Sequence, residues 1–394
     1  GPASTRSGMP PSRLRAIKPS GELRRTTKPT SSMCPTKATC GLPDPTVIDK
    51  DVIAYRNWAV RRKLTLLNAG RDALVDFPLP VLLDPGRIEY ALTQDQGQDL
   101  RFFDADGSLL DHEIERWDES GTSVVWVRVP EVAVDSDSDY IWMAYGNPNA
   151  ADAQNPDGVW DDNFVGVWHL AETSGTTAHD SSGKGNHGSY VNGPTLDQTG
   201  GFGDTAVLFD PAQDHHVDLG GLDVVGAAGD DGLTLEAYAR LANDTGADRR
   251  LISKADGWGV GDHYWMLSLE DGTELRFRLR TGGSTDTQVA WGTDVSDNEW
   301  FYGVARYEGA HMRIYFDGVR EADSGKSGTM DTDPAVDAWI GANPDNAYAP
   351  WDGPISEIRI SNIGRSEDWI AAQSQALHDD VADPFVLYGP AEPL

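Results

Sequence analysis

The residues best suited to chemistry lie in a glycine-rich loop that runs from Asp180 to Gly188. Asp180 and Asn186 supply side-chain oxygens, and the glycines between them permit turns that direct backbone carbonyls inward. About six to eight oxygen ligands of this kind surround Ca²⁺ in proteins. The loop therefore predicts a calcium ion that stabilises the scaffold and takes no part in catalysis. A turn held together by hydrogen bonds from Asx side chains is the alternative.

A second set of candidates consists of aromatic residues near predicted turns. The face of a sugar ring or an apolar side chain can stack on an exposed aromatic ring. The predicted ligand-binding residues are Trp258, Tyr264, Trp265, Trp291 and Trp351. Packing at the edge of a sheet is the alternative for each tryptophan in a loop. A basic row, Arg276, Arg278 and Arg280, is interpreted as a solvated sheet face with acidic neighbours.

The search for a catalytic set ends without one. Retaining glycosidases need two carboxyl groups about 5 Å apart, which alternate positions of one strand can supply. The acidic run from Glu113 to Glu119 has this character, but Arg116 and Trp117 interrupt its alternation. The histidines show no H-E-x-x-H spacing, and the sequence contains no G-x-S-x-G elbow. The sequence therefore predicts that the protein is not an enzyme.

Composition narrows the choice of partners. The 394 residues carry a net charge of −31, and residues 1–50 have a local charge of +6, so the remainder has −37. An acidic surface of this size repels nucleic-acid phosphates, and no apolar run approaches the roughly 18 residues that a membrane span needs. The two cysteines, Cys34 and Cys40, are both in the basic stretch. They could close one small loop, and their spacing does not indicate a zinc site.

Three segments follow one another along the chain. Residues 1–50 are rich in Ser, Thr, Pro, Arg and Lys, which predicts a linker or a disordered arm that begins with a tag remnant. Residues 51–153 alternate in short runs separated by turn signals, a pattern typical of a small β-sandwich. Residues 158–390 continue with about a dozen strands, which suit two packed antiparallel sheets. One helix is expected from Ser366 to Leu377, with Ser366 as its N-cap.

The first of these β modules resembles the bacterial DUF2341 family. The resemblance is carried by Asp99–Gly107, then Trp126–Pro130, then Tyr145-Gly146-Asn147-Pro148, in that order. The family is a β module of unknown function in surface and secreted proteins. The resemblance therefore implies an extracellular or cell-surface location, with the signal peptide removed.

The second module resembles the concanavalin A-like/laminin G jelly roll. The matching residues are Trp168, Glu172, Asp180–Gly188, Phe209, Asp210, Tyr315–Val319 and Gly353–Ile360. In that fold the loop at Asp180 often holds a calcium ion together with an acid near the last strand, which implies Glu357 as a third ligand. Ser356 stands where the family has an Asp. The resemblance implies an all-β protein, a small sandwich followed by a larger jelly roll.

Three functions are compatible with these observations. The first is a non-catalytic, extracellular adhesion protein that binds a glycan or a cell-surface protein through the jelly roll. The second is a purely structural component of a surface assembly. The third is a glycoside hydrolase on the same fold, which would need paired carboxylates on a concave strand of the jelly roll. The first is the prediction, because the sequence shows no such pair.

Overall fold

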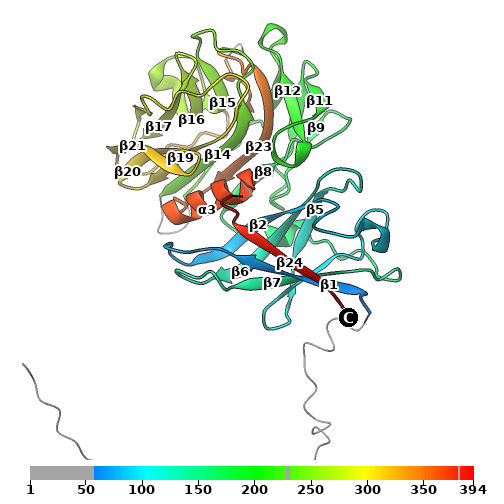
Figure 1. The fold of residues 1–394 in the computed structure, drawn as a ribbon. Helices are drawn as coiled ribbons and strands as arrows, with labels where there is room; N and C mark the ends of the chain where they lie inside the picture. The colour runs from blue at the N-terminus through cyan, green and yellow to red at the C-terminus, as the bar shows by residue number, and fades with distance from the viewer. Residues whose placement is uncertain (1–56, 227–230, 346, 380–381) are drawn as a thin grey trace, which may run out of the picture. The chain divides into compact units, whose positions relative to one another are not determined.

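The computed structural model describes residues 57–226, 231–345, 347–379 and 382–394, whose regular secondary structure is mostly β-strand (Figure 1). This confirms the predicted all-β fold class. The predicted arm at residues 1–50, with Cys34 and Cys40, lies outside the described residues. No helix in the described ranges has the length and apolar character that a membrane span requires.

The first β-sandwich consists of two antiparallel sheets. One sheet has the order β24-β1-β7-β3-β4, with β1 at Val60–Leu66, β3 at Arg101–Asp104, β4 at Leu109–Leu110, β7 at Tyr140–Tyr145 and β24 at Val386–Pro393. The other has the order β2-β6-β5, with β2 at Leu74–Leu83, β5 at His112–Arg116 and β6 at Ser123–Val132. Leu64, Phe77 and Val127 belong to the core of this sandwich. Alternate residues of each strand face this core, as the pleat requires.

The last strand of the chain, β24, belongs to this first sandwich. It pairs antiparallel with β1, from Val60 opposite Pro393 to Leu66 opposite Val386. The predicted limit of residue 390 for the second module is therefore wrong at its C-terminal end. Alternating residues could not reveal this, because a strand that returns to a distant sheet has the same local pattern as one that stays.

The second β-sandwich contains two larger sheets (Figure 1). The first has the order β18-β17-β16-β15-β22-β13-β10-β9, with β9 at Thr177–Ala178, β10 at Gly188–Val191, β13 at His216–Asp218, β15 at Arg249–Ala255, β16 at His263–Glu270, β17 at Glu274–Thr281, β18 at Ser284–Val289 and β22 at Ala338–Ile340. The second has the order β11-β12-β23-β14-β19-β20-β21, with β11 at Thr195–Gln198, β12 at Ala206–Phe209, β14 at Gly232–Arg240, β19 at Trp300–Glu308, β20 at His311–Phe316, β21 at Val319–Gly325 and β23 at Gly353–Ser361. Strand β8 at Phe164–Trp168 also pairs with β23.

Two helices complete the described part, a single turn α2 at Pro156–Val159 and the longer α3 at Glu367–His378. The Ser366 hydroxyl accepts a hydrogen bond from the Trp369 backbone N–H at 3.1 Å, so the predicted helix and its N-cap are confirmed. Trp369 packs edge-on against Phe77 of β2, with ring centroids 5.8 Å apart. The apolar face of α3 is thus buried against the first sandwich.

Strand β23 is buried on both of its faces. It therefore holds the most unusual polar groups of the protein inside the molecule. Ile358 and Ile360 point into the core of the second sandwich. Glu357 and Arg359 alternate with them and point to the opposite face, yet both are almost completely buried. Residues of the first sandwich, Trp126 among them, cover that face. Charged side chains at these positions are therefore enclosed at the junction of the two sandwiches.

Candidate functional site

The loop at Asp180 is held together by its own hydrogen bonds. Oδ1 of Asp180 accepts from the backbone N–H groups of Val167 and Ser182, and Oδ2 accepts from that of Asn186, all within 3.0 Å. The Asn186 side-chain amide donates to the carbonyl of Val165 at 2.7 Å. These bonds are those of an Asx-stabilised turn, the alternative considered for this loop. The predicted calcium ion stays a prediction.

Glu357, the third predicted calcium ligand, makes its contacts elsewhere. Its Oε2 lies 2.8 Å from Nδ1 of His169, and its Oε1 lies 3.3 Å from Nε of Arg359. Within the described residues no contact joins Glu357 to Asp180 or Asn186. The three predicted ligands are therefore divided between two neighbourhoods of the molecule.

Three of the five aromatic residues predicted to bind a ligand are buried. Trp351 and Trp265 belong to the core of the second sandwich and expose at most 2% of their surface. The prediction is wrong for these two, because an enclosed ring cannot stack on a ligand. Tyr264 is also buried, and the cations of Lys254 and Arg280 lie over its ring at 5.8 and 4.9 Å.

The other two tryptophans are open to solvent but lie apart. Trp258 is 66% exposed and Trp291 is 70% exposed. Trp258 precedes β16, near the end of the sheet where Thr281 pairs with Ser284. Trp291 follows β18 at the other end of the sheet, beyond the pair of Arg276 and Val289. The length of β17 therefore separates the two rings. A single groove does not contain both.

Trp258 has an aromatic neighbour that the sequence did not indicate. The ring of Tyr348, which is 46% exposed, lies 6.4 Å from that of Trp258. The guanidinium of Arg250 lies over the ring of Tyr348 at 5.7 Å. We call Trp258 and Tyr348 the aromatic edge.

Two residues of the basic row, Arg276 and Arg278, are buried, contrary to the solvated face that was predicted, whereas Arg280 is partly exposed. Arg276 and Arg278 expose 2% and 8% of their surfaces, and Arg276 pairs with Asp248 at 2.8 Å. Arg250 lies beside them, and its Nε and Nη1 make no hydrogen bond within the described residues. Burial first, and then the charge of Arg276, lowers the pKa of Arg250 to about 9.

The least expected polar group of the structure is His169, which follows β8 directly. Its Nδ1 lies 2.8 Å from Glu357 of β23 and 3.5 Å from Oε2 of Glu115 on β5. Its Nε2 lies 3.5 Å from Oε2 of Glu113, also on β5. We call these four residues the junction cluster, because Glu113 and Glu115 come from the first sandwich and His169 and Glu357 from the second.

Aromatic rings and hydrogen bonds fix the first-sandwich side of the cluster. The imidazole of His169 stacks on Trp126, with centroids 5.6 Å apart and an interplanar angle of 18°. The Trp126 indole N–H donates to Glu115 at 2.7 Å. The Ser181 hydroxyl donates to Glu113 at 2.7 Å. Glu113 on β5 lies directly opposite Trp126 on β6. The pairing register of these two strands therefore positions the carboxylates next to the tryptophan ring.

A second group of buried charged and polar residues lies next to the cluster, on strands β23, β14 and β19. Arg359 is fully buried, and its Nη1 lies 3.6 Å from Oε2 of Glu236 on β14. The Tyr302 hydroxyl on β19 donates to the same Glu236 oxygen. The strand pairing places Glu236 opposite Arg359, which explains this contact. Arg359 thus lies between Glu236 and Glu357.

The surroundings shift the pKa values of the cluster residues in different directions. Burial raises the pKa of Glu115 to about 7, and the charge of Glu357 adds to the rise, although His169 opposes it. Burial also acts on Glu113, but His169 and the donors around Glu113 outweigh it and lower the pKa. Burial alone would lower the pKa of His169, and the three glutamates raise it well above its ordinary value.

A cavity of about 200 Å³ gives access to this cluster. Its lining includes Glu113, Glu115 and His169, together with Glu172 and His179. The cavity thus reaches both carboxylates whose pKa values differ. Groups with these properties can bind a cation or transfer a proton.

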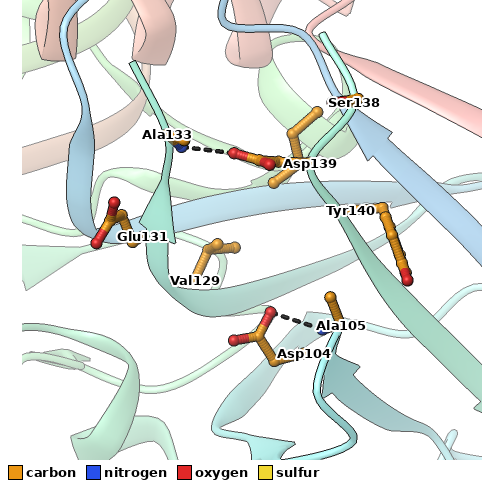
Figure 2. A pocket seen from close by; sticks show the side chains of 9 residues that line it. Asp104, Ala105, Val129, Glu131, Ala133, Ser138, Asp139 and Tyr140 are labelled. Atoms are coloured by element: carbon orange, nitrogen blue, oxygen red, sulfur yellow. Dashed lines mark hydrogen bonds between the residues drawn. The ribbon is translucent and has the colours of Figure 1, made fainter. Parts of the chain in front are cut away.

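Another cavity, of about 230 Å³, lies in the first sandwich (Figure 2). Figure 2 shows Asp104 and Asp139 in its wall, each hydrogen-bonded to a backbone N–H, that of Ala105 at 2.7 Å and that of Ala133 at 2.5 Å. Their carboxylates stabilise local turns. We find no convergent polar groups there among the lining residues.

The family comparisons agree with the order of the two modules. Residues 96–218 match the model of a domain of unknown function, DUF2341, and residues 211–371 match the concanavalin A-like lectin/glucanases superfamily. The two matches follow each other in the order that the sequence predicted. The DUF2341 match extends beyond residue 153 and includes β8, so it covers His169 as well as Glu113 and Glu115. The internal limits at residues 153 and 158 stay predictions.

Several solved structures are similar to part of the chain. The binding domain of Paraclostridial Mosquitocidal Protein 1 is 14% identical, with a TM-score of 0.41, over 55% of this chain and 52% of that one. Domain 4 of AbnA, an extracellular arabinanase from Geobacillus stearothermophilus solved with arabinotriose, is 14% identical, with a TM-score of 0.38, over 54% and 98%. The CBM40 of a Ruminococcus gnavus IT-sialidase, bound to sialyllactose, is 15% identical, with a TM-score of 0.32, over 36% and 82%.

The matched part spans about half the length of the toxin binding domains. No curated protein matches the sequence.

Proposed function

We propose that this protein is a non-catalytic binding protein of the cell surface or the extracellular space. Its concanavalin A-like domain recognises carbohydrate or a cell-surface partner. The observation that carries this proposal is the aromatic edge, where two exposed rings lie side by side, tilted by 49°, with their centroids 6.4 Å apart. Amphipathic rings of this kind supply a large contact area for the apolar face of a sugar.

The loop that carries Trp258 is held in place, which favours binding. The Asp262 carboxylate accepts a hydrogen bond from the Gly259 backbone N–H at 2.8 Å. The side-chain amide of Asn343 donates to the carbonyl of Gly257 at 2.9 Å. A loop anchored on both sides of its tryptophan loses less conformational entropy when a ligand binds, and this strengthens affinity.

The experiment is a glycan array with the wild-type protein and three variants. We expect Trp258→Ala and Tyr348→Ala to weaken binding at least about tenfold, the effect of losing about 1.4 kcal/mol of contact energy. Trp291→Ala is the matched control, because its ring is equally exposed but lies beyond the other end of β17. Equal loss in all three variants contradicts a site at the aromatic edge.

A wild-type protein that binds no glycan and no cell surface supports the alternative, a purely structural component of a surface assembly. Self-association measured by light scattering then identifies that role. The absence of glycan binding, cell-surface binding and self-association together contradicts both functions.

One observation favours glycoside hydrolysis as a second candidate. Glu113 and Glu115 lie on one strand beside a cavity, and their pKa values are shifted in opposite directions. Such a difference is typical of an acid and its partner carboxylate. Release of reducing sugar by the wild-type protein, lost in Glu115→Gln, would establish it. Activity that persists in that variant assigns the hydrolysis to another site or to a contaminant.

A further inference from the structure

We infer that the junction cluster is a binding site for a divalent transition-metal cation, such as Zn²⁺ or Mn²⁺. One ligand atom from each of Glu115, His169 and Glu357 lies within 4.8 Å of the other two. Two ligands of one cation with bond lengths of about 2.0–2.2 Å lie at most about 4.4 Å apart, so the side chains must move slightly closer together to share it. Within the described residues this is the one such group of three.

The buried charges at the junction are unbalanced in a way that favours the binding of a cation. Four buried carboxylates face one another there, those of Glu113, Glu115, Glu236 and Glu357. Two cationic groups face them, the permanently charged Arg359 and the imidazole of His169. The carboxylates are therefore in excess even when His169 is protonated. Buried charge is costly unless it is paired, and a divalent cation supplies the missing charge.

Two buried atoms of the cluster have no hydrogen-bond partner within the described residues, and they face Glu113 and Arg359 rather than the other ligand atoms. These atoms are Nε2 of His169 and Oε1 of Glu357. The side chains that carry them are only 7% and 1% exposed. The nearest charged atoms, at 3.3 and 3.5 Å, are too distant or poorly aligned for hydrogen bonds. Buried polar atoms without partners are rare in proteins, so these two show that the polar groups of the junction are not fully satisfied.

The ligands are accessible from solvent through the cavity beside Glu113. Glu115 and His169 line that cavity, so an ion that enters it meets two of its three ligands. Glu113, which also lines the cavity and lies 3.5 Å from His169, can supply a further ligand. The site is thus buried but open on one side.

The ligand types select the cation. An imidazole nitrogen is a good ligand for Zn²⁺ and a poor one for Ca²⁺, whose ligands in proteins are oxygens. Two carboxylates with one imidazole suit Zn²⁺ or Mn²⁺. The ion would join Glu115 of the first sandwich to His169 and Glu357 of the second, so its binding should stabilise the junction. This role is independent of glycan recognition at the aromatic edge.

The test titrates chelator-treated full-length protein with ZnCl₂, MnCl₂ and CaCl₂, followed by calorimetry and thermal unfolding. We expect saturable binding of one Zn²⁺ or Mn²⁺ and a rise in Tm of about 5 °C, with a much smaller response to Ca²⁺. Cobalt substitution should produce visible ligand-field absorption. Glu115→Gln and His169→Gln should abolish both signals, and Glu119→Gln, an exposed acid near β5, should retain them.

Circular dichroism of each variant separates a lost site from a lost fold. If His169→Gln does not fold, Glu115→Gln decides, because its amide keeps the shape of the carboxylate. Zinc binding that survives in the folded Glu115→Gln variant belongs to other histidines and overturns the assignment. Wild-type protein that binds neither Zn²⁺ nor Mn²⁺, or that responds to Ca²⁺ alone, overturns it as well.

Discussion

The loop at Asp180 and the junction cluster both contain carboxylate oxygens, but the two regions use them differently. Each oxygen of the Asp180 carboxylate accepts a hydrogen bond from at least one backbone N–H. In the junction cluster Oε1 of Glu357 and Nε2 of His169 make no hydrogen bond with any residue in the part of the chain that the structure describes. The comparison teaches that capacity for a ligand depends on unused lone pairs, which the count of oxygen-bearing residues does not reveal.

The largest expected effect tests whether the junction charges depend on one another. Arg359→Met keeps the length of the side chain but leaves Glu236 and Glu357 without their buried cation. We expect the free energy of unfolding of metal-free protein to fall by about 3–5 kcal/mol. Urea unfolding followed by tryptophan fluorescence measures the change.

Arg320→Met is the matched control for this prediction. Arg320 pairs with Glu367 at 2.7 Å, but both side chains are more than 40% exposed. A solvent-screened pair of this kind contributes less than about 1 kcal/mol. Equal losses in the two variants would show that burial at the junction does not strengthen its ion pairs.

The next effect concerns pH and the proton on Glu115. Its pKa is 4.5 in the unfolded chain and about 7 in the folded protein, so the folded state binds the proton more tightly. The free energy of unfolding therefore falls as the pH rises from 4.5 to 7. His169 acts in the same direction from pH 6.5 upward, because its pKa is raised. Glu113, with a lowered pKa, contributes stability that is lost only as the pH falls below 4.5.

Glu115→Gln should flatten this profile. The variant lacks the group that must lose its proton between pH 4.5 and 7, so the metal-free variant should gain up to about 3 kcal/mol relative to wild type on going from pH 4.5 to pH 8. Chemical unfolding across this pH range measures the difference. An unchanged slope between pH 4.5 and 7 would place the titrating group elsewhere.

A smaller effect is expected in the loop at Asp180, the region with which the junction cluster was compared. Asp180→Asn replaces an acceptor oxygen by an amide that cannot accept from a backbone N–H. We expect a loss of about 1–2 kcal/mol in unfolding free energy, the same in EDTA as in excess CaCl₂. Thermal and urea unfolding in both solutions measure it. A loss confined to the calcium solution would instead confirm the predicted calcium site.

The sequence predicted the fold well because its signals are local. Alternation, turn residues and the Ser366 cap each act within a few neighbouring residues, and the structure confirms the strands and the helix that they indicated. The return of β24 to β1 could not be predicted, since it depends on a pairing across more than 300 residues.

The junction cluster escaped sequence analysis for the same reason. Glu113 and Glu115 were recognised as part of the acidic run from Glu113 to Glu119. The run was considered as a whole, so the position of these two residues on the same face of one strand was not used. His169 and Glu357 are 188 residues apart, and only the sandwich brings them together. The tryptophans show the converse error, because Trp351 follows a turn signal and is nevertheless enclosed in the core. Composition near a turn does not determine burial, which depends on what the rest of the chain places over it.

The smallest expected effect concerns Trp291, which is exposed to the same degree as Trp258 but has no aromatic partner recorded among the described residues. Trp291→Ala should change the unfolding free energy by less than about 0.5 kcal/mol, because little surface is buried there. Glycan affinity should also be retained. If Trp291→Ala instead weakens binding while Trp258→Ala does not, the ligand site lies at the opposite end of β17. The pairing of Trp258 with Tyr348 would then be a packing contact only.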